Sequence, residues 1–177
     1  MRASALLFAS AFITLPAFAD PPLPAPIAEA NSGKLQCYSP NVANKTCRSM
    51  GAYKPGAKGV IDNIAIVLIA SQPLVVMETV SPVTVKKGQV CGPLRAQDID
   101  ASKITADGKA VEAQQATTIR QQMKAALKDM LGHEVCTAYR PKDGMLLARA
   151  SLDGVEKPEL DQKVIWVSRT DGYRLGP

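Results

Sequence analysis

Four cysteines are the residues with the clearest chemistry in this 177-residue chain. An even set of cysteines favours disulfide bonds when a chain is exported to an oxidising compartment. Four cysteines allow three pairings. The sequence favours a Cys37–Cys47 bridge, which would close a short loop in an irregular segment. The second bridge, Cys91–Cys136, would join a strand before the predicted helix to a strand after it. No metal site is expected, because there is no C-x-x-C pair and His133 is the only histidine.

Basic residues form the candidate binding surface. Arg120, Lys124 and Lys128 recur at intervals of four, with no acid three or four residues away from any of them. Like charges at this spacing are mildly destabilising in a helix. The stripe is therefore either a solvated edge, paired with carboxylates elsewhere in the fold, or a surface for an anion. Lys45 and Arg48 lie in a second segment that holds several cations and no acid.

The partner that fits such a basic surface is an anionic envelope component, such as a lipid headgroup or a glycan acid, or another exported protein of acidic character. Nucleic acid is not expected. The chain has 21 Lys and Arg against 16 Asp and Glu, a modest excess, and only 5% of its residues are aromatic, which leaves few rings for base stacking.

Acidic side chains are the remaining candidates for catalysis. Paired carboxylates can perform acid–base chemistry on glycans when a cleft tunes their pKa values. Two predicted loops carry such groups: Asp98 with Asp100, and Glu156 with Glu159 and Asp161. No serine-hydrolase, zinc-protease or phosphate-loop motif occurs. The sole histidine, His133, follows Gly132 at the predicted C-terminal end of the helix, where the helix dipole is expected to stabilise a protonated surface imidazole. We therefore expect no catalytic residue and no cofactor.

Residues 1–19 have the layout of a secretory signal peptide. Arg2 precedes an apolar run that ends with the small residues Ala17 and Ala19, so cleavage is predicted before Asp20. The run is too short for a membrane anchor, and no later stretch is expected to cross a membrane. The sequence thus predicts secretion, and a periplasmic location if the source is a Gram-negative bacterium.

The remaining chain predicts a Pro-rich leader over residues 20–33 and one globular domain over residues 34–177. Runs of β-branched and apolar residues predict strands at 60–70, 74–80, 83–86, 89–91, 134–139, 145–151 and 163–169, with an interruption at Ser81-Pro82. Turns between strands are expected at Lys87-Gly88 and Asp143-Gly144. A loop with a turn signal at Asp107-Gly108 is expected over residues 92–110, and Asp153-Gly154 is expected to mark a longer loop. A helix over 110–131 is predicted from apolar residues at helical spacing, namely Ile119, Met123, Ala126, Leu127 and Met130.

This order of elements predicts an α+β fold. A mostly antiparallel sheet, built from a meander and later hairpin strands, would carry one long amphipathic helix on a face and would be stabilised by disulfides. Such a domain is most simply a non-catalytic binding or envelope-associated protein. Two alternatives stay open: a small hydrolase acting on a cell-envelope polymer, and a subunit of an exported assembly that offers a sheet edge to its neighbours.

Overall fold

The computed structural model describes residues 21–56 and 59–177, so the predicted signal peptide lies outside the described residues. The strands are β1 (Leu35–Tyr38), β2 (Thr46–Cys47), β3 (Ser49–Pro55), β4 (Ile61–Ser71), β5 (Leu74–Lys86), β6 (Gln89–Pro93), β7 (Lys103–Ala106), β8 (Lys109–Ala110), β9 (Glu134–Lys142), β10 (Met145–Leu152), β11 (Val155–Glu156), β12 (Gln162–Val167) and β13 (Arg174–Leu175). The helices are α1 (Ala96–Asp100) and α2 (Ala113–Ala126), with 3-10 turns η1 (Ala28–Ser32), η3 (Pro158–Leu160) and η4 (Arg169–Asp171).

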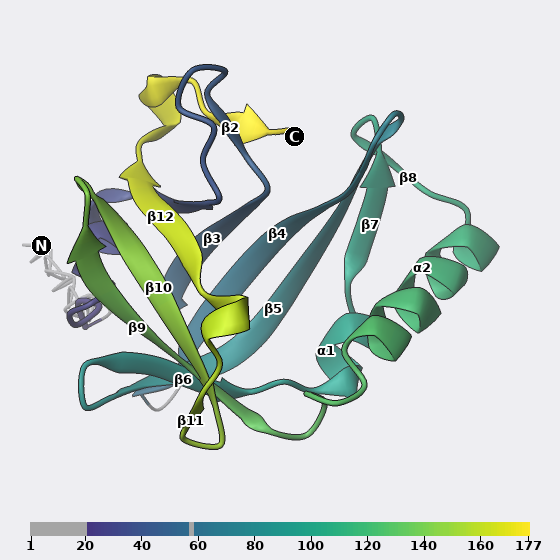
Figure 1. The fold of residues 1–177 in the computed structure, drawn as a ribbon. Helices are drawn as coiled ribbons and strands as arrows, with labels where there is room; N and C mark the ends of the chain where they lie inside the picture. The colour runs from purple at the N-terminus through teal and green to yellow at the C-terminus, as the bar shows by residue number, and fades with distance from the viewer. Residues whose placement is uncertain (1–20, 57–58) are drawn as a thin grey trace, which may run out of the picture.

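Eight of these strands close into an antiparallel barrel (Figure 1). The order around the wall is β4-β3-β1-β12-β10-β9-β6-β5, and β5 pairs again with β4. The predicted α+β fold, an open sheet with a long helix across one face, is therefore wrong. The sheet is closed on itself, and α2 is the only helix of seven or more residues in the part of the chain that the structure describes.

Barrel closure depends on pairings between segments that are far apart in the chain. Strand β1 lies beside β12, with Leu35 opposite Val167, and β6 lies beside β9, with Cys91 opposite Cys136. Closure removes the exposed edges that an open sheet of the same strands would present. Alternation along each strand then sends one set of side chains into the lumen and the other set outward.

Two-residue turns join several neighbouring strands. At Lys87-Gly88, Asp107-Gly108, Asp143-Gly144 and Asp153-Gly154, both residues have positive φ, between 48° and 82°. This conformation belongs to the tight hairpin turns whose twist matches that of the flanking strands, and Gly adopts it without steric cost. The turns predicted at Lys87-Gly88 and Asp143-Gly144 are confirmed. Asp107-Gly108 and Asp153-Gly154, which were predicted within longer loops, are tight hairpin turns between β7 and β8 and between β10 and β11.

The predicted interruption at Ser81-Pro82 is absent, and β5 runs through it as one strand of 13 residues. Strand β5 pairs with β7 up to Glu78 and with β6 from Thr84 onward, so between these points β4 is its one partner among the paired strands. Proline lacks an N–H and is tolerated where a strand has a free side. Beside this stretch, a Cβ on Gly92 would meet the Pro82 carbonyl oxygen at 2.6 Å, so only glycine fits this close approach.

The first half of β5, the second half of β4 and the hairpin of β7 and β8 project beyond the barrel, and α2 covers this projection (Figure 1). Ala116 of α2 packs with Val75, Met77 and Ile104. Helix α2 spans 14 residues and ends at Ala126, so the predicted range of 110–131 was too long. Among the described residues, no helix has the length and apolar character needed to cross a membrane.

The main core fills the barrel lumen. Val83, Val90 and Val164 are among its buried side chains, and Leu23 and Ile27 from the Pro-rich segment join them at 5% and 0% exposure. The Pro-rich segment therefore packs into the lumen through these two apolar side chains, which water would otherwise surround.

Both disulfides form in the pairing that the sequence favours. Cys37–Cys47 lies in a second core on the outer side of the barrel wall, where it packs with Met50 and Val167. Cys91–Cys136 joins directly opposed residues of two wall strands. Two disulfides are consistent with a protein of an oxidising compartment.

Candidate functional site

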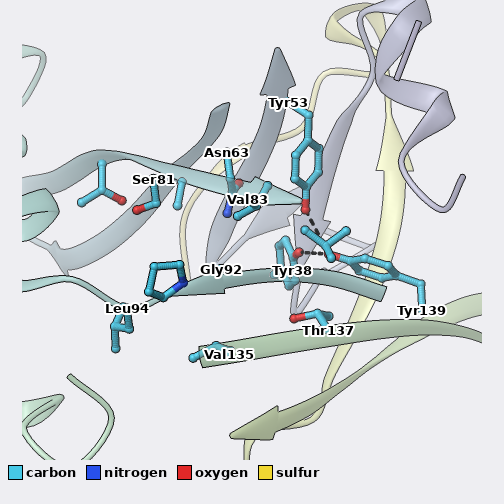
Figure 2. Close-up of a pocket in the computed structure, with 14 residues that line it drawn as sticks. Tyr38, Tyr53, Asn63, Ser81, Val83, Gly92, Leu94, Val135, Thr137 and Tyr139 are labelled. Atoms are coloured by element: carbon cyan, nitrogen blue, oxygen red, sulfur yellow. Dashed lines mark hydrogen bonds between the residues drawn. The ribbon is translucent and has the colours of Figure 1, made fainter. Parts of the chain in front are cut away.

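The barrel lumen contains a cavity of about 220 Å³ (Figure 2). Side chains from six wall strands line it, because inward-facing positions alternate along each strand. Half of the lining residues carry a hydrogen-bonding side chain: Tyr38, Tyr53, Asn63, Thr79, Ser81, Thr137 and Tyr139. The apolar remainder includes Val83, Val90, Leu94 and Val135. Such a mixture, apolar walls with a few convergent polar groups, is typical of small-molecule sites.

The hydroxyls of Tyr38, Tyr53 and Tyr139 meet at the wall of this cavity (Figure 2). All three also lie within hydrogen-bond distance of one amide, that of Gln36. The Gln36 Oε1 atom lies 2.7 Å from the hydroxyl of Tyr38, 3.0 Å from that of Tyr53 and 3.1 Å from that of Tyr139. The Tyr139 hydroxyl is also 2.7 Å from that of Tyr38 and 3.1 Å from that of Tyr53. We call these four residues the tyrosine cluster.

The tyrosine cluster has fewer protons than short oxygen–oxygen distances. Five oxygen pairs lie between 2.7 and 3.1 Å apart. Three hydroxyls supply three protons, and the carbonyl of Gln36 supplies none. The cluster therefore holds unused acceptor capacity. Gln36 itself is fully buried, and its Nε2 has no hydrogen-bond partner among the described residues, a feature that costs about 1–3 kcal/mol.

Tyr38 and Tyr53 are neutral at physiological pH. Burial is the main cause that raises the pKa of Tyr38 and of Tyr53 well above the ordinary tyrosine value, and the neighbouring Tyr139 raises both pKa values further. A phenol that keeps its proton in this way can donate and accept hydrogen bonds, but it supplies neither a general base nor a nucleophile near neutral pH. The cluster is therefore equipped for recognition.

A second cavity of about 260 Å³ lies beside the first and shares Tyr38, Leu94, Val135 and Thr137 with it. Its other lining residues are mostly apolar: Leu127, Met130, Ala148, Ala150 and Leu160, together with Gln162. Among the described residues, no Asp, Glu, Lys, Arg or His lines either cavity. Because 21% of the residues in the whole sequence are charged, the absence of charged side chains from both cavity linings does not simply reflect a chain poor in charge.

The predicted basic residues are spread over two parts of the surface. On α2, Arg120 donates to the Ser102 carbonyl at 2.6 Å, and Lys124 pairs with Asp100 at 2.6 Å. Lys128 lies after the helix end and is exposed. The structure thus brings Arg120 and Lys124 together, where they attach α2 to the segment that contains α1.

The second basic group lies apart from α2, around β2 (Figure 1). The Lys45 ammonium donates to the Asp171 carbonyl oxygen at 2.9 Å, and Arg48 is exposed next to β2. The two basic groups do not form one surface. Arg120, Lys124 and Lys45 have partners in segments that lie elsewhere in the sequence, so the sequence alone could not assign these contacts.

Four of the five candidate acids have structural partners: Asp98, Asp100, Glu156 and Asp161, the last of which accepts from the Ala150 N–H at 3.1 Å. Glu159 is exposed. Asp98 is 8% exposed and accepts two hydrogen bonds from Arg95, at 2.6 and 3.0 Å. Asp100 pairs with Lys124, and Glu156 pairs with Arg149 at 2.7 Å. None of these carboxylates lines either lumen cavity. The arrangement holds loops and helices in place and does not present a free pair of carboxyls.

His133 lies beyond the end of α2, so the predicted interaction with the helix dipole does not apply. Its Nδ1 pairs with Asp153 on the β10–β11 turn, and this contact is the main cause that lowers the pKa of Asp153. Within the described ranges, Cys91, Glu134 and Cys136 are the group whose ligand atoms lie close enough for a metal. Their two sulfurs are joined in a disulfide and offer no thiolate.

Sequence reasoning missed the tyrosine cluster. Its one local signal is alternation, since Gln36 and Tyr38 are two residues apart on β1 and must face the same side. Tyr53 and Tyr139 lie on other strands, and their convergence depends on barrel closure. We found no match to the chain among protein-family models, curated proteins or solved structures.

Proposed function

We propose that this protein is a small exported binding protein, without a catalytic role, that takes a small molecule into the barrel lumen. The observation that carries the proposal is the lumen cavity with its three converging tyrosine hydroxyls. A buried cluster with spare acceptor capacity and an unpartnered amide is costly to keep in a core. Such a cost is common where a protein recognises a ligand.

Two further features favour binding over hydrolysis of an envelope polymer. The carboxylates of Asp98, Asp100 and Glu156 are paired with Arg95, Lys124 and Arg149, and they do not line the lumen cavities. Tyr38 and Tyr53, which line the lumen, keep their protons, because burial raises their pKa.

Export is the second part of the proposal. It is supported by the signal-like residues 1–19 and by two disulfides, which persist in oxidising compartments such as the bacterial periplasm. Intact mass analysis of the protein recovered from the periplasm of a Gram-negative expression host tests it. We expect a chain that begins at Asp20 and contains no free thiol. A full-length cytoplasmic chain with four free thiols would contradict it.

Ligand entry into the lumen is tested with small neutral probes, namely acetamide, 2-propanol and phenol, titrated into isotope-labelled protein and followed by ¹H–¹⁵N NMR. We expect shift changes at backbone amides around the tyrosine cluster. The Ala65→Phe variant places a ring in the cavity and should abolish them. The Ala125→Phe variant changes an exposed position of α2 and should leave them intact.

Overpacking a lumen costs about 1–3 kcal/mol, so the dispersion of the spectrum must first show that the Ala65→Phe variant is folded. Probe-induced shifts that persist in that variant, or a cavity that none of the three probes perturbs, would contradict lumen binding.

A further inference from the structure

We propose that the ligand is a neutral amphiphile, with an alkyl or acyl chain and an uncharged head that both donates and accepts hydrogen bonds, such as a primary amide or a hydroxyl. The inference rests on the proposed lumen-binding function. It assigns the head to the cavity beside the tyrosine cluster and the chain to the neighbouring apolar cavity.

The absence of charge in the described lining of both cavities decides against an ionic ligand. An ionised carboxylate or ammonium that enters an apolar site without a partner pays a large desolvation cost. The protein has many charged side chains, but the structure places them outside both cavities, in surface pairs such as Lys124 with Asp100 and Arg149 with Glu156. A neutral head meets no such penalty.

The nature of the head follows from the tyrosine cluster. The hydroxyls of Tyr38, Tyr53 and Tyr139 belong to residues that line the cavity, and a phenol hydroxyl can both donate a hydrogen bond to a ligand and accept one from it. The Asn63 and Ser81 side chains, which line the same cavity, can both donate and accept. A head with both a donor and an acceptor therefore satisfies this cavity best.

The neighbouring apolar cavity indicates where the alkyl or acyl chain of the ligand would lie. Leu127 and Met130 were predicted to extend the apolar stripe of the helix, but α2 ends at Ala126 and both side chains line this cavity instead. Both are half-buried, and Met is a flexible side chain that adapts to an apolar guest. Because the two cavities share four lining residues, one molecule can contact both.

A matched series of eight-carbon probes tests the inference with the mature, disulfide-bonded protein. Octanamide and 1-octanol carry neutral heads, whereas octanoate and octylamine carry a charge at pH 7 on the same chain. In NMR titrations we expect the neutral probes to shift amides around both cavities. The charged probes should bind at least about tenfold more weakly, because their heads must be desolvated without a partner.

Two pairs of variants localise the contacts. Tyr53→Phe removes one cluster hydroxyl and should weaken octanamide about three- to tenfold, the range expected for one hydrogen bond, whereas Tyr173→Phe lies outside both cavities and should not. Leu127→Ala should weaken the octyl probes, whereas Leu131→Ala, a change in the same turn but outside the cavity, should leave them unchanged.

Equal affinity for octanoate and octanamide, or octyl binding that ignores both Tyr53→Phe and Leu127→Ala, would overturn the inference. If no octyl probe shifts the amide signals around the lumen but acetamide or phenol does, the amphiphile assignment fails and the proposed lumen-binding function stands. If neither set of probes shifts these signals, both proposals fail.

Discussion

The two disulfides should contribute unequally to stability, because they close loops of different length. The sequence separation is 45 residues for Cys91–Cys136 and 10 residues for Cys37–Cys47. The entropy that a cross-link removes from the unfolded chain grows with the logarithm of the loop length. At 25 °C it gives about 4 kcal/mol for the long loop and about 3 kcal/mol for the short one.

Two double variants isolate each bridge. Cys37→Ala with Cys47→Ala keeps the long-loop bridge, and Cys91→Ala with Cys136→Ala keeps the short-loop bridge. The free energy of unfolding of each variant is measured by urea titration with and without a thiol reductant. Comparing the oxidised and reduced forms of one variant keeps its sulfur atoms in place, so the difference reports the cross-link rather than lost packing.

The reductant should lower the free energy of unfolding by about 1 kcal/mol more in the variant that keeps the long-loop bridge. It should also raise the denaturant slope in both variants, since an uncrosslinked chain exposes more surface on unfolding. A larger loss in the variant that keeps Cys37–Cys47 would refute the loop-entropy reasoning. The interaction of that bridge with its outer core, where both cysteines are fully buried, would then dominate.

Three further predictions concern pH and packing. Burial raises the pKa of Tyr38 and Tyr53 above that of unfolded tyrosine. The stability contributed by these tyrosines is therefore present below about pH 10 and is lost as the pH rises through the folded pKa; urea titrations from pH 8 to 11 should show it, and a flat profile would contradict it. The pKa of Asp153 is lowered, mainly by its hydrogen bond with His133. Wild type should thus exceed Asp153→Asn in stability above about pH 4, with a difference that vanishes as the pH falls through the folded pKa; an unchanged difference at pH 2 would argue against this pair. Ile104→Ala should cost about 2–5 kcal/mol in urea unfolding, because the side chain is 4% exposed beneath α2, and a loss under 1 kcal/mol would show that α2 contributes little.

Local features of the molecule were predictable from the chain because their causes lie within a few residues. Asp143-Gly144 forms a hairpin turn since its two residues tolerate positive φ and apolar strands flank it. Four cysteines in a chain with a signal-like start favour bridges. The interruption predicted at Ser81-Pro82 was wrong because proline is tolerated where a strand has a free side, and β5 has one strand partner there.

The sequence by itself determined six of the strands (β4, β5, β6, β9, β10 and β12), two of the tight turns, the existence of one longer helix and the preferred disulfide pairs, since propensity, glycine conformation and cysteine chemistry act locally. It did not determine β1 and β3, which complete the barrel wall. The tertiary structure alone decided that the sheet closes, that α2 covers a projection of the barrel, and that Gln36 meets Tyr53 and Tyr139 in the lumen. The physical reason is that closure depends on which strands, far apart in the sequence, pair their backbone N–H and C=O groups. The alternation of apolar and polar residues within one strand does not specify its partner.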